Sequence, residues 1–459
     1  MSDYSAEIAA VVLAAGLGTR MKSDRPKVMH EIANRPLVGH VRAALSAIPL
    51  AREVVVIGPD QQAIADAVTP VQTAVQHDRL GTADAVKAAR ERLAGFDAGT
   101  ILVLFGDTPF IRTETLTSMI RAREAGAGVV VLGFRADDPT GYGRLVTDGA
   151  GALSAIVEHK DASEAERAIN LCNSGVMAID ASILFPLVDR IGNDNAKGEY
   201  YLTDIVALAR GEGLDVQVIE ASEEELLGIN SRVELADAEK LWQQTRRRTV
   251  MEDGATLLDP ETVWFSADTV VGRDVTIAQN VVFGPGVTVE DGAEIRSFCH
   301  LEGCRVASGA QVGPYARLRP GADIGAKARV GNFVEVKNAT LEGGAKANHL
   351  AYIGDAHVGA DANIGAGTIT CNYDGFLKSR TIIGAGAFIG SNSALVAPVE
   401  VGEGAIVGAG STVTKNVEPD AIAVARGRQT TLPGAARKFR DKRRREKEAA
   451  VKGDEFKDK

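Results

Sequence analysis

Between Phe265 and Val413 an apolar residue returns every six positions, a period that fits neither an amphipathic helix nor a single half-buried strand. Glycine and other small residues separate these positions. The pattern is typical of a hexapeptide β-helix, in which each short strand turns one apolar side chain inward and stacked coils cover one another. The positions in register, with one slip of a residue before Val306, are Phe265, Val271, Ile277, Phe283, Val289, Ile295, Leu301, Val306, Val312, Leu318, Ile324, Val330, Val336, Ile383, Ile389, Leu395, Val401, Val407 and Val413.

The first half of the chain alternates continuous apolar runs with helical patterns, which predicts a mostly parallel α/β sheet. Runs that are apolar throughout indicate strands buried on both faces. Ligands of such sheets bind beyond the carboxyl ends of the strands, so the residues directly after each run are the candidates for chemistry. The expected strands are Ile8–Leu13, Glu53–Ile57, Thr100–Phe105, Val129–Phe134 and Val216–Glu220.

The two patterns are joined by a stretch of good helix formers. Ser231 followed by Glu234 has the spacing of a capping box, and Gly254 is placed to end the helix. We expect a connector helix over 233–253, which divides the chain into an N-terminal domain over 1–232 and a coil domain over 254–459 with a basic tail.

The composition narrows the possible partners. A net charge of −10 over 459 residues argues against nucleic acid as the main partner, although residues 437–447 are strongly basic. A solvated tail is the simpler interpretation of that stretch, and a bound polyanion is the alternative. The four cysteines show no paired spacing, and the apolar run over 8–15 is too short to cross a membrane and follows no basic segment. We expect a cytoplasmic protein without a membrane partner.

The first expected strand opens into a glycine-containing loop with cations behind it. Gly16 and Gly18 allow the backbone to approach a phosphate closely, and Arg20 and Lys27 supply positive charge. The loop is neither a Walker A motif nor a dinucleotide fingerprint. A plain glycine turn is the alternative, which the two cations disfavour.

The strand over 100–105 ends in Gly-Asp107, and a single carboxylate at a strand tip suits Mg²⁺, although Asp is also a common turn residue.

In the coil, the interruptions of the period are the candidate sites. The segment 370–380 breaks the repeat, as functional loops do. Arg319 and Lys337 each follow an inward position, so their side chains should point outward, where two cations suit a phosphate.

From the residues alone, His349 could be a structural histidine or a zinc ligand. His300 and His357 directly precede core positions, whereas His349 lies two residues after Ala347. These different phases disfavour one metal shared by the three histidines, as in a γ-type carbonic anhydrase.

Together the motifs closely resemble the bacterial family of bifunctional N-acetylglucosamine-1-phosphate uridylyltransferases/glucosamine-1-phosphate acetyltransferases, over about residues 8–430. The resemblance implies a Rossmann-like α/β nucleotidyltransferase domain, a connector helix, a left-handed parallel β-helix and a homotrimer. The motifs that carry it are Leu-Ala-Ala-Gly-x-Gly-Thr-Arg-Met (13–21), Pro26-Lys27, Gln76, Leu80-Gly81-Thr82, Gly-Asp107, Gly141-Tyr-Gly143-Arg, Ile156-Val-Glu158-His-Lys-Asp161 and Asn173-Ser-Gly175.

For the N-terminal domain the resemblance implies uridylyl transfer from UTP to N-acetylglucosamine 1-phosphate. Arg20 and Lys27 would be catalytic, and Asp107 with Asn230 would bind Mg²⁺. Leu17 and Phe105 depart from the family, which commonly has a basic residue and a Tyr there. The implied nucleotide-sugar contacts are Leu13, Ala14, Ala15, Gly16, Lys27, Gln76, Gly81, Thr82, Phe105, Gly106, Asp107, Gly143, Glu158, Asn173 and Asn230.

For the coil the resemblance implies acetyl transfer from acetyl-CoA to glucosamine 1-phosphate with His349 as general base, the step that precedes uridylylation. The product, UDP-N-acetylglucosamine, would feed peptidoglycan and lipopolysaccharide synthesis. The alternatives are a nucleotidyltransferase whose coil only oligomerises, as in ADP-glucose pyrophosphorylases, and a scaffold with two dead sites. The implied ligands of the sugar phosphate are Arg319, Lys337, Tyr352, Asn363 and Lys378, and those of acetyl-CoA are Ala366, Asn372, Tyr373, Ser391, Ala409 and Arg426.

Overall fold

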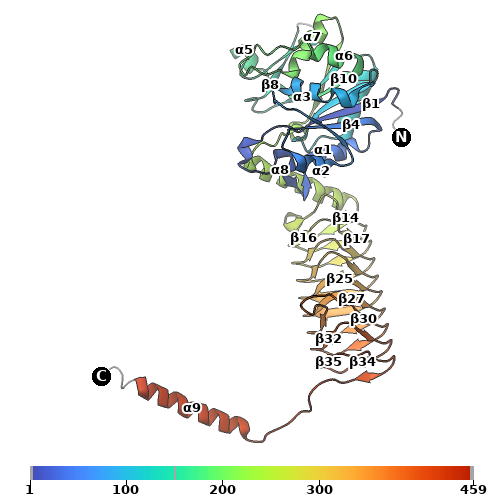
Figure 1. Ribbon diagram of the computed structural model, residues 1–459, viewed down its shortest axis with the longest axis vertical. Helices are drawn as coiled ribbons and strands as arrows, with labels where there is room; N and C mark the ends of the chain where they lie inside the picture. Colours follow the sequence, from blue (N-terminus) through green and yellow to red (C-terminus); the bar gives the residue numbers. More distant parts are fainter. Residues whose placement is uncertain (1–3, 149–150, 455–459) are drawn as a thin grey trace. The chain divides into compact units, whose positions relative to one another are not determined.

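The computed structural model describes residues 4–148 and 151–454. The chain forms two compact units (Figure 1). The first comprises residues up to 253 with 259–269 and 283–286, and the second comprises 254–258, 270–282 and the chain from 287 onward.

The first unit is built on a twisted sheet whose strand order is β11-β7-β10-β6-β1-β4-β5. Every neighbouring pair along this path is parallel except those of β10, which runs antiparallel to both β6 and β7. All five expected strands are present, and the mostly parallel α/β fold is confirmed. The bounds are β1 Ile8–Leu13, β4 Leu50–Ile57, β5 Gln72–Val75, β6 Thr100–Phe105, β7 Val129–Arg135, β10 Leu171–Asp180 and β11 Val216–Ala221, with β8 Gly143–Thr147 and β9 Leu153–Val157 beside β10 and the small pair β2 Glu31–Ile32 and β3 Arg35–Pro36.

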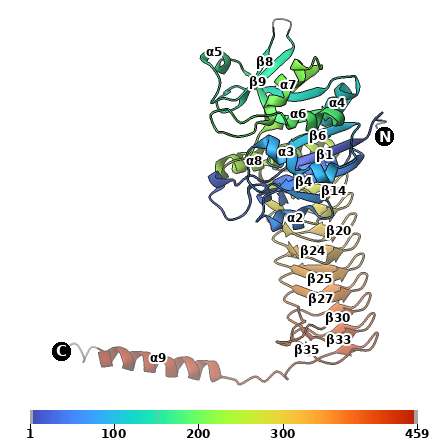
Figure 2. The same cartoon turned by 45° about the horizontal axis from the view of Figure 1, so that its top comes forward.

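Helices cover both faces of this sheet (Figures 1 and 2). Ala9 and Val11 of β1 contribute to a core shared with α3, α6 and α7, whereas Ala10 and Val12 contribute to a core shared with α1, α2 and α4. This explains why the strand reads as one continuous apolar run, since both of its faces are buried. The helices are α1 Leu37–Leu45, α2 Gln62–Val68, α3 Thr82–Ala88, α4 Thr113–Glu124, α5 Glu164–Arg167, α6 Ala181–Val188 and α7 Ile205–Gly211, with short 3-10 turns at Thr19–Met21, Lys27–Met29, Arg90–Leu93, Leu202–Asp204, Glu223–Leu226 (η5) and Pro260–Thr262.

The helix between the two sequence patterns, α8, spans Arg232–Glu252. Ser231 caps it by accepting the amide of Glu234, and Gly254 follows with a left-handed φ of 104°. The capping box is only half formed. The Glu234 carboxylate accepts the backbone amide of Asn230 (2.7 Å) rather than that of Ser231, which ties the residue ahead of the helix to its first turn.

The second unit is a stack of short strands in parallel register, with each coil paired to the next (Figures 1 and 2). The apolar residues of the six-residue period point inward and most are fully buried. The expected left-handed parallel β-helix of hexapeptide repeats is confirmed. One face is the sheet of β12 Thr256–Leu257, β15 Thr276–Ile277, β18 Glu294–Ile295, β21 Gln311–Val312, β24 Arg329–Asn332, β26 Lys346–His349, β28 Asn363–Ile364, β31 Phe388–Ile389, β34 Ile406–Val407 and β36 Ile422–Ala423, called face C below.

The remaining short strands line the other faces. A helix, α9, spans Ala435–Asp454 at the end of the described chain. No helix among the described residues is both long enough and apolar enough to cross a membrane. The strands are β14 Val270–Val271, β16 Val281–Phe283, β17 Thr288–Val289, β19 His300–Leu301, β20 Arg305–Val306, β22 Arg317–Leu318, β23 Ala322–Ile324, β25 Glu335–Leu341, β27 Tyr352–Val358, β29 Ile369–Cys371, β30 Thr381–Ile383, β32 Ala394–Val396, β33 Val399–Val401 and β35 Thr412–Val413, while β13 Val263–Trp264 and the last residue of β16 belong to the first unit.

One corner of the coil carries a column of large exposed side chains. Phe298, Tyr315 and Phe333 stack ring on ring with centroids 4.8 and 5.1 Å apart, and Leu350 follows one coil later. All four have left-handed backbone, with φ between 50° and 61°, a conformation that is costly for bulky residues. The corner separates face C from the face that holds β22, β25 and β27, called face D below.

Candidate active sites

In the first unit, a cavity of about 300 Å³ lies at the carboxyl ends of β1 and β6. Gln76, buried in its wall, donates its amide hydrogens to the Gly81 carbonyl (2.9 Å) and to Asp84 Oδ2 (2.8 Å). This leaves the amide oxygen as an acceptor. Residues of the implied nucleotide set that line the cavity are Leu13, Ala14, Ala15, Gly16, Lys27, Gln76, Gly81, Thr82, Phe105 and Asp107. Gly106 is not among the lining residues, and its amide donates to the Leu13 carbonyl (2.9 Å).

Lys27 and Asp107, which line this cavity, meet Asn230, which lines a separate cavity, although the three lie far apart in the chain. The Lys27 ammonium forms an ion pair with the Asp107 carboxylate and donates to Asn230 Oδ1 (3.0 Å). The positively charged Lys27 ammonium therefore lies between the Asp107 carboxylate and the Asn230 amide oxygen. One carboxylate with an amide oxygen is a donor set that Mg²⁺ accepts together with phosphate oxygens, so the residues fit that ion.

A second cavity of about 250 Å³ shares Thr82 and Phe105 with the first and is lined by Gly143, Glu158 and Asn173. Burial raises the pKa of Glu158, while the Lys197 ammonium opposes that shift. The Phe105 ring lies so close over Gly175, whose φ is 86°, that a β-carbon there would collide with it. The two cavities suit a nucleotide and a sugar placed side by side.

Arg20 does not line the cavity that holds Lys27 and Asp107. It lines a third cavity of about 450 Å³ together with Tyr142 and Asn230. The structure thus brings Lys27, Asp107 and Asn230 together, and of these three Arg20 shares a cavity with Asn230 alone.

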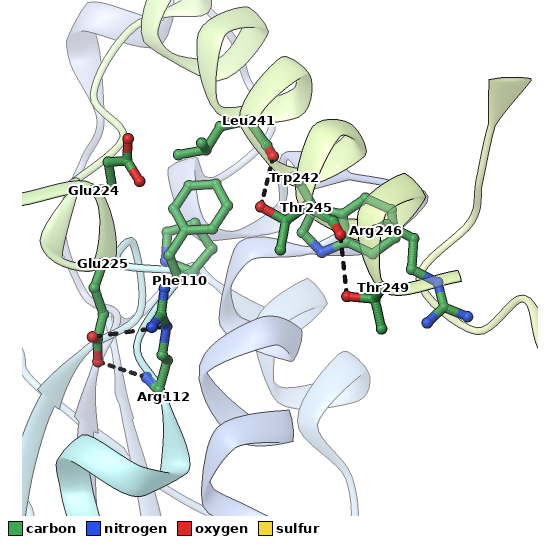
Figure 3. A pocket seen from close by; sticks show the side chains of 10 residues that line it. Phe110, Arg112, Glu224, Glu225, Leu241, Trp242, Thr245, Arg246 and Thr249 are labelled. Atoms are coloured by element: carbon green, nitrogen blue, oxygen red, sulfur yellow. Dashed lines mark hydrogen bonds and ion pairs between the residues drawn. The ribbon is translucent and has the colours of Figure 1, made fainter. Parts of the chain in front are cut away.

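A further cavity of about 290 Å³ lies between the loop after Asp107, the η5 turn and α8. Figure 3 shows Phe110 pointing between Glu224 and α8, and the carboxylate of Glu225 accepting the backbone amide of Arg112 (3.0 Å). Its walls come from the loop that follows Asp107, from the turn that precedes Asn230, and from α8.

Sequence reasoning missed three charged residues of the first two cavities. Arg79, held by a hydrogen bond from Nε to the Ala15 carbonyl (2.8 Å), lines the first cavity, Lys197 the second, and Glu199 both. Arg79 directly precedes the Leu-Gly-Thr motif, which is a usable signal. Lys197 and Glu199 lie in an irregular segment without one.

In the second unit, His349 ends β26 and Asn332 ends β24, and the two are paired in register. The Nδ1 of His349 lies 2.8 Å from the Oδ1 of Asn332. An amide oxygen only accepts, so Nδ1 carries a hydrogen, and in the neutral ring Nε2 then has its lone pair free. Asn332, one coil earlier in the chain, is therefore a positioning residue for the predicted base.

Three of the predicted acetyl-CoA residues form one column with His349. Ala366, Ser391 and Ala409 each lie two residues after a core position of face C, as His349 does, and backbone hydrogen bonds join the column from coil to coil. Arg426 ends the column by donating to the Ala409 carbonyl (2.6 Å).

Three of the five predicted sugar-phosphate ligands, Arg319, Lys337 and Tyr352, lie on face D. Lys337 and Lys378 lie against each other, and the pKa of Lys337 is lowered chiefly by the neighbouring Lys378 and further by Arg319. Arg319 also donates to Glu335 (2.8 Å). Such crowding of like charge favours an anionic ligand.

The loop over 371–380 that supplies Lys378 is tied to the coil at its base. Buried Asn372 donates to the Asp355 carboxylate, and Asp374 accepts the amides of Phe376 and Leu377 at the tip (2.8 and 2.7 Å). Tyr373 pairs with Lys378 across the loop.

The predicted residues of the acetyl site do not all lie on one face of the chain. His349 and Asn363 lie on face C, whereas Arg319, Lys337 and Tyr352 lie on face D beyond the corner column. No hydrogen bond or ion pair among the described residues joins His349 to these cations.

The described residues contain no group of three or more His, Cys, Asp or Glu side chains arranged for a metal ion. His357 instead contacts Glu342, with Nε2 and Oε1 3.0 Å apart.

Comparisons with known proteins agree with both halves. Residues 10–172 match the MobA-like NTP transferase domain, and residues 380–415 match the bacterial transferase hexapeptide (six repeats). A bifunctional protein GlmU of Rhodospirillum rubrum is 63% identical over 439 residues, which is 95% of this chain and 98% of the relative. The chain belongs to the GlmU family. Other GlmU proteins, from Paramagnetospirillum magneticum and Azorhizobium caulinodans, are 59% and 55% identical over 95% and 96% of the chain and 97% and 98% of their own lengths.

Membership of the GlmU family confirms the predicted bifunctional enzyme, a uridylyltransferase joined to a hexapeptide acetyltransferase. It removes the two alternatives, a coil that only oligomerises and a scaffold without activity.

Proposed function

We propose that the coil transfers an acetyl group from acetyl-CoA to the amine of glucosamine 1-phosphate, and that the sheet unit then transfers uridylyl from UTP to the N-acetylated product. The observation that carries the proposal is the coexistence of the Lys27–Asp107–Asn230 cluster in a strand-end cavity with the His349–Asn332 pair and its acetyl-CoA column. UDP-N-acetylglucosamine, a precursor for peptidoglycan and lipopolysaccharide synthesis, is the final product.

In the uridylyl site the protein positions substrates and neutralises charge. The free amide oxygen of Gln76 accepts the imide hydrogen of uracil. Lys27 and Arg20 bind the phosphates, while Gly143, Glu158 and Asn173 hold the acceptor sugar so that its phosphate attacks the α-phosphorus and pyrophosphate leaves. Asp107 and Asn230 would hold Mg²⁺, which would neutralise phosphate charge when bound.

In the acetyl site, His349 Nε2 removes a proton from the amine as the nitrogen attacks the thioester carbonyl, and coenzyme A leaves as the thiol. Asn332 keeps the imidazole in the tautomer that this step requires. Acetyl-CoA lies along Ala366, Ser391 and Ala409 toward Arg426, with Asn372 and Tyr373 beside it. Arg319, Lys337, Tyr352, Asn363 and Lys378 bind the sugar phosphate.

The active form is a homotrimer in which face C of one chain meets face D of its neighbour. Two observations support this: the predicted sugar-phosphate ligands lie on both sides of a corner within one chain, and that corner exposes a stacked aromatic column. Exposed apolar columns of this kind are usually interaction surfaces.

We place the enzyme in the reducing cytoplasm, which suits its four free cysteines.

Two variants assayed for both reactions test the proposal. We expect His349→Ala to lower acetyl transfer by at least about a hundredfold, the usual contribution of a general base, and to spare uridylyl transfer. Asp107→Ala should do the reverse, and chelation of divalent cations should stop only uridylyl transfer. Acetyl transfer near the wild-type rate in His349→Ala would remove the general-base role, and loss of both reactions on chelation would indicate a metal in the coil.

A further inference from the structure

Arg79 is a cation in the wall of the first cavity, of about 300 Å³, to which the uridylyl reaction as described above gives no role. Its Nε donates to the Ala15 carbonyl (2.8 Å), and its guanidinium lies against Gly58, where a β-carbon would collide with it. The backbone of Arg79 is left-handed, with φ of 49°, a conformation that is uncommon for such a residue and that recurs at functional positions. The guanidinium is therefore oriented before any ligand binds.

The other donors of Arg79 remain available. In the part of the chain that the structure describes, the Ala15 carbonyl is the one hydrogen-bond partner of this guanidinium, and no carboxylate pairs with it. Of the two acids that line the cavity, Asp107 pairs with Lys27, and Glu199 forms no ion pair with Arg79. A guanidinium offers donors and no acceptor, so the group that it can bind in this cavity is an acceptor oxygen.

The strand order β6-β1-β4-β5 indicates which part of a nucleotide lies near Arg79. Asp107, with Lys27 on it, follows the end of β6, whereas Gly58 follows β4 and Gln76 follows β5. A nucleotide with its phosphates at Lys27 and its base at Gln76 extends across these strand ends, with the ribose between them. The uracil atom opposite the ribose, across the ring, is the O4 carbonyl oxygen. This oxygen therefore lies at the β4–β5 end of the cavity, where Arg79 is.

We propose that Arg79 is a specificity-determining residue of the uridylyl site and donates to O4 of uracil, next to the imide hydrogen that Gln76 accepts. The inference rests on the proposed uridylyl transfer and adds to it a residue that selects the base. Cytosine has an amino group in place of O4, which would set donor against donor at Arg79. Gln76 cannot turn its amide toward cytosine without losing its bonds to Gly81 and Asp84.

The test is Arg79→Met, with Arg92→Met as a matched control. Arg92 also donates Nε to a backbone carbonyl, that of Thr73 on β5 (3.2 Å), but it is exposed and does not line the cavity. We expect Arg79→Met to lower kcat/KM for UTP about tenfold, the effect of one charged hydrogen bond, and not to lower it for CTP. The preference for UTP over CTP should thus fall about tenfold, whereas Arg92→Met should keep the preference of the wild type.

Two thio analogues locate the contact on the base. Sulfur accepts hydrogen bonds more weakly than oxygen, so the wild type should use 4-thio-UTP about tenfold less well than UTP. Arg79→Met should use these two nucleotides about equally well, and it should lose as much with 2-thio-UTP as with UTP. Equal losses in Arg79→Met with UTP, 4-thio-UTP and CTP would mean that Arg79 only supports the loop at Ala15, and would overturn the proposal.

Calorimetric binding of UTP separates this inference from the proposed function. If the wild type binds UTP without transferring uridylyl, and Arg79→Met weakens binding of UTP but not of 4-thio-UTP, the role of Arg79 stands and the proposed reaction fails. If the wild type transfers uridylyl and Arg79→Met keeps the preference for UTP over CTP, the role of Arg79 fails alone. The wild type by itself also decides, should Arg79→Met not fold, because equal use of UTP and 4-thio-UTP would overturn the proposal.

Discussion

His40 is a buried histidine on α1 whose environment makes the first unit sensitive to acid. Its Nε2 lies 2.8 Å from the Ile32 carbonyl, to which it donates as the neutral ring, and the Trp242 ring of α8 packs against its edge with centroids 6.3 Å apart. Burial lowers the pKa of His40 from 6.5 to about 4, with Arg35 adding to the effect. The unfolded chain therefore binds more protons than the folded chain between those two pH values, and stability falls as pH drops through that window.

We expect His40→Gln to reduce the loss of stability between pH 7 and pH 4.5 by about 2–3 kcal/mol, because glutamine keeps a donor and does not titrate. His77, exposed in the same unit, provides the control His77→Gln, which should follow the wild type. Urea unfolding at both pH values measures the difference. Parallel pH slopes for wild type and His40→Gln would contradict this account.

At the scale of elements, side chains of α8 make hydrogen bonds to backbone groups that a neighbouring strand would otherwise pair with. Gln243, which is fully buried, donates Nε2 to the Phe265 carbonyl (2.7 Å) and accepts the Phe265 amide through Oε1 (2.9 Å). One side chain thus satisfies both backbone groups of a residue at the start of the hexapeptide pattern. Arg247 donates to the Val263 carbonyl (2.8 Å) from the next turn of the helix.

We expect Gln243→Ala to lower the free energy of unfolding by about 2–4 kcal/mol, since it leaves a buried N–H and a buried C=O without partners. Gln244→Ala, a change on the exposed side of the same helix, should cost less than about 0.5 kcal/mol. Denaturant unfolding of both variants provides the comparison. A similar loss in the two variants would mean that helix propensity, rather than the pairing with Phe265, decides the effect.

At the scale of the whole molecule, the decisive prediction concerns sharing of the acetyl site between chains. His349 lies on face C and Lys337 on face D, so a trimer would build each site from two neighbours. Co-expression of His349→Ala with Lys337→Ala should restore acetyl transfer, because about a quarter of randomly mixed sites receive both intact residues. Each variant alone should remain impaired, and gel filtration should show trimers in every case. Mixed trimers no more active than the single variants would place both groups in one chain's site.

The sequence by itself determined which segments of this protein form strands and which of their side chains are buried. The six-residue period dictates which side chains point into the coil, and the continuous apolar runs dictate a sheet covered on both faces, because both patterns follow from side-chain direction within one strand. It also identified Lys27, Asp107 and the loop over 371–380 as candidates, since strand ends and interrupted repeats are visible in one dimension.

Only the tertiary structure decided which of these residues meet. Asn332 lies 17 residues before His349, and the length of one coil brings them together. Lys27 contacts Asn230 across 203 residues, and Gln243 pairs with Phe265 where a strand would otherwise do so. The separation of His349 from Lys337 by a corner likewise depends on how the coil turns. Such contacts depend on register and on the path of the chain in space, which the pattern of one strand does not contain.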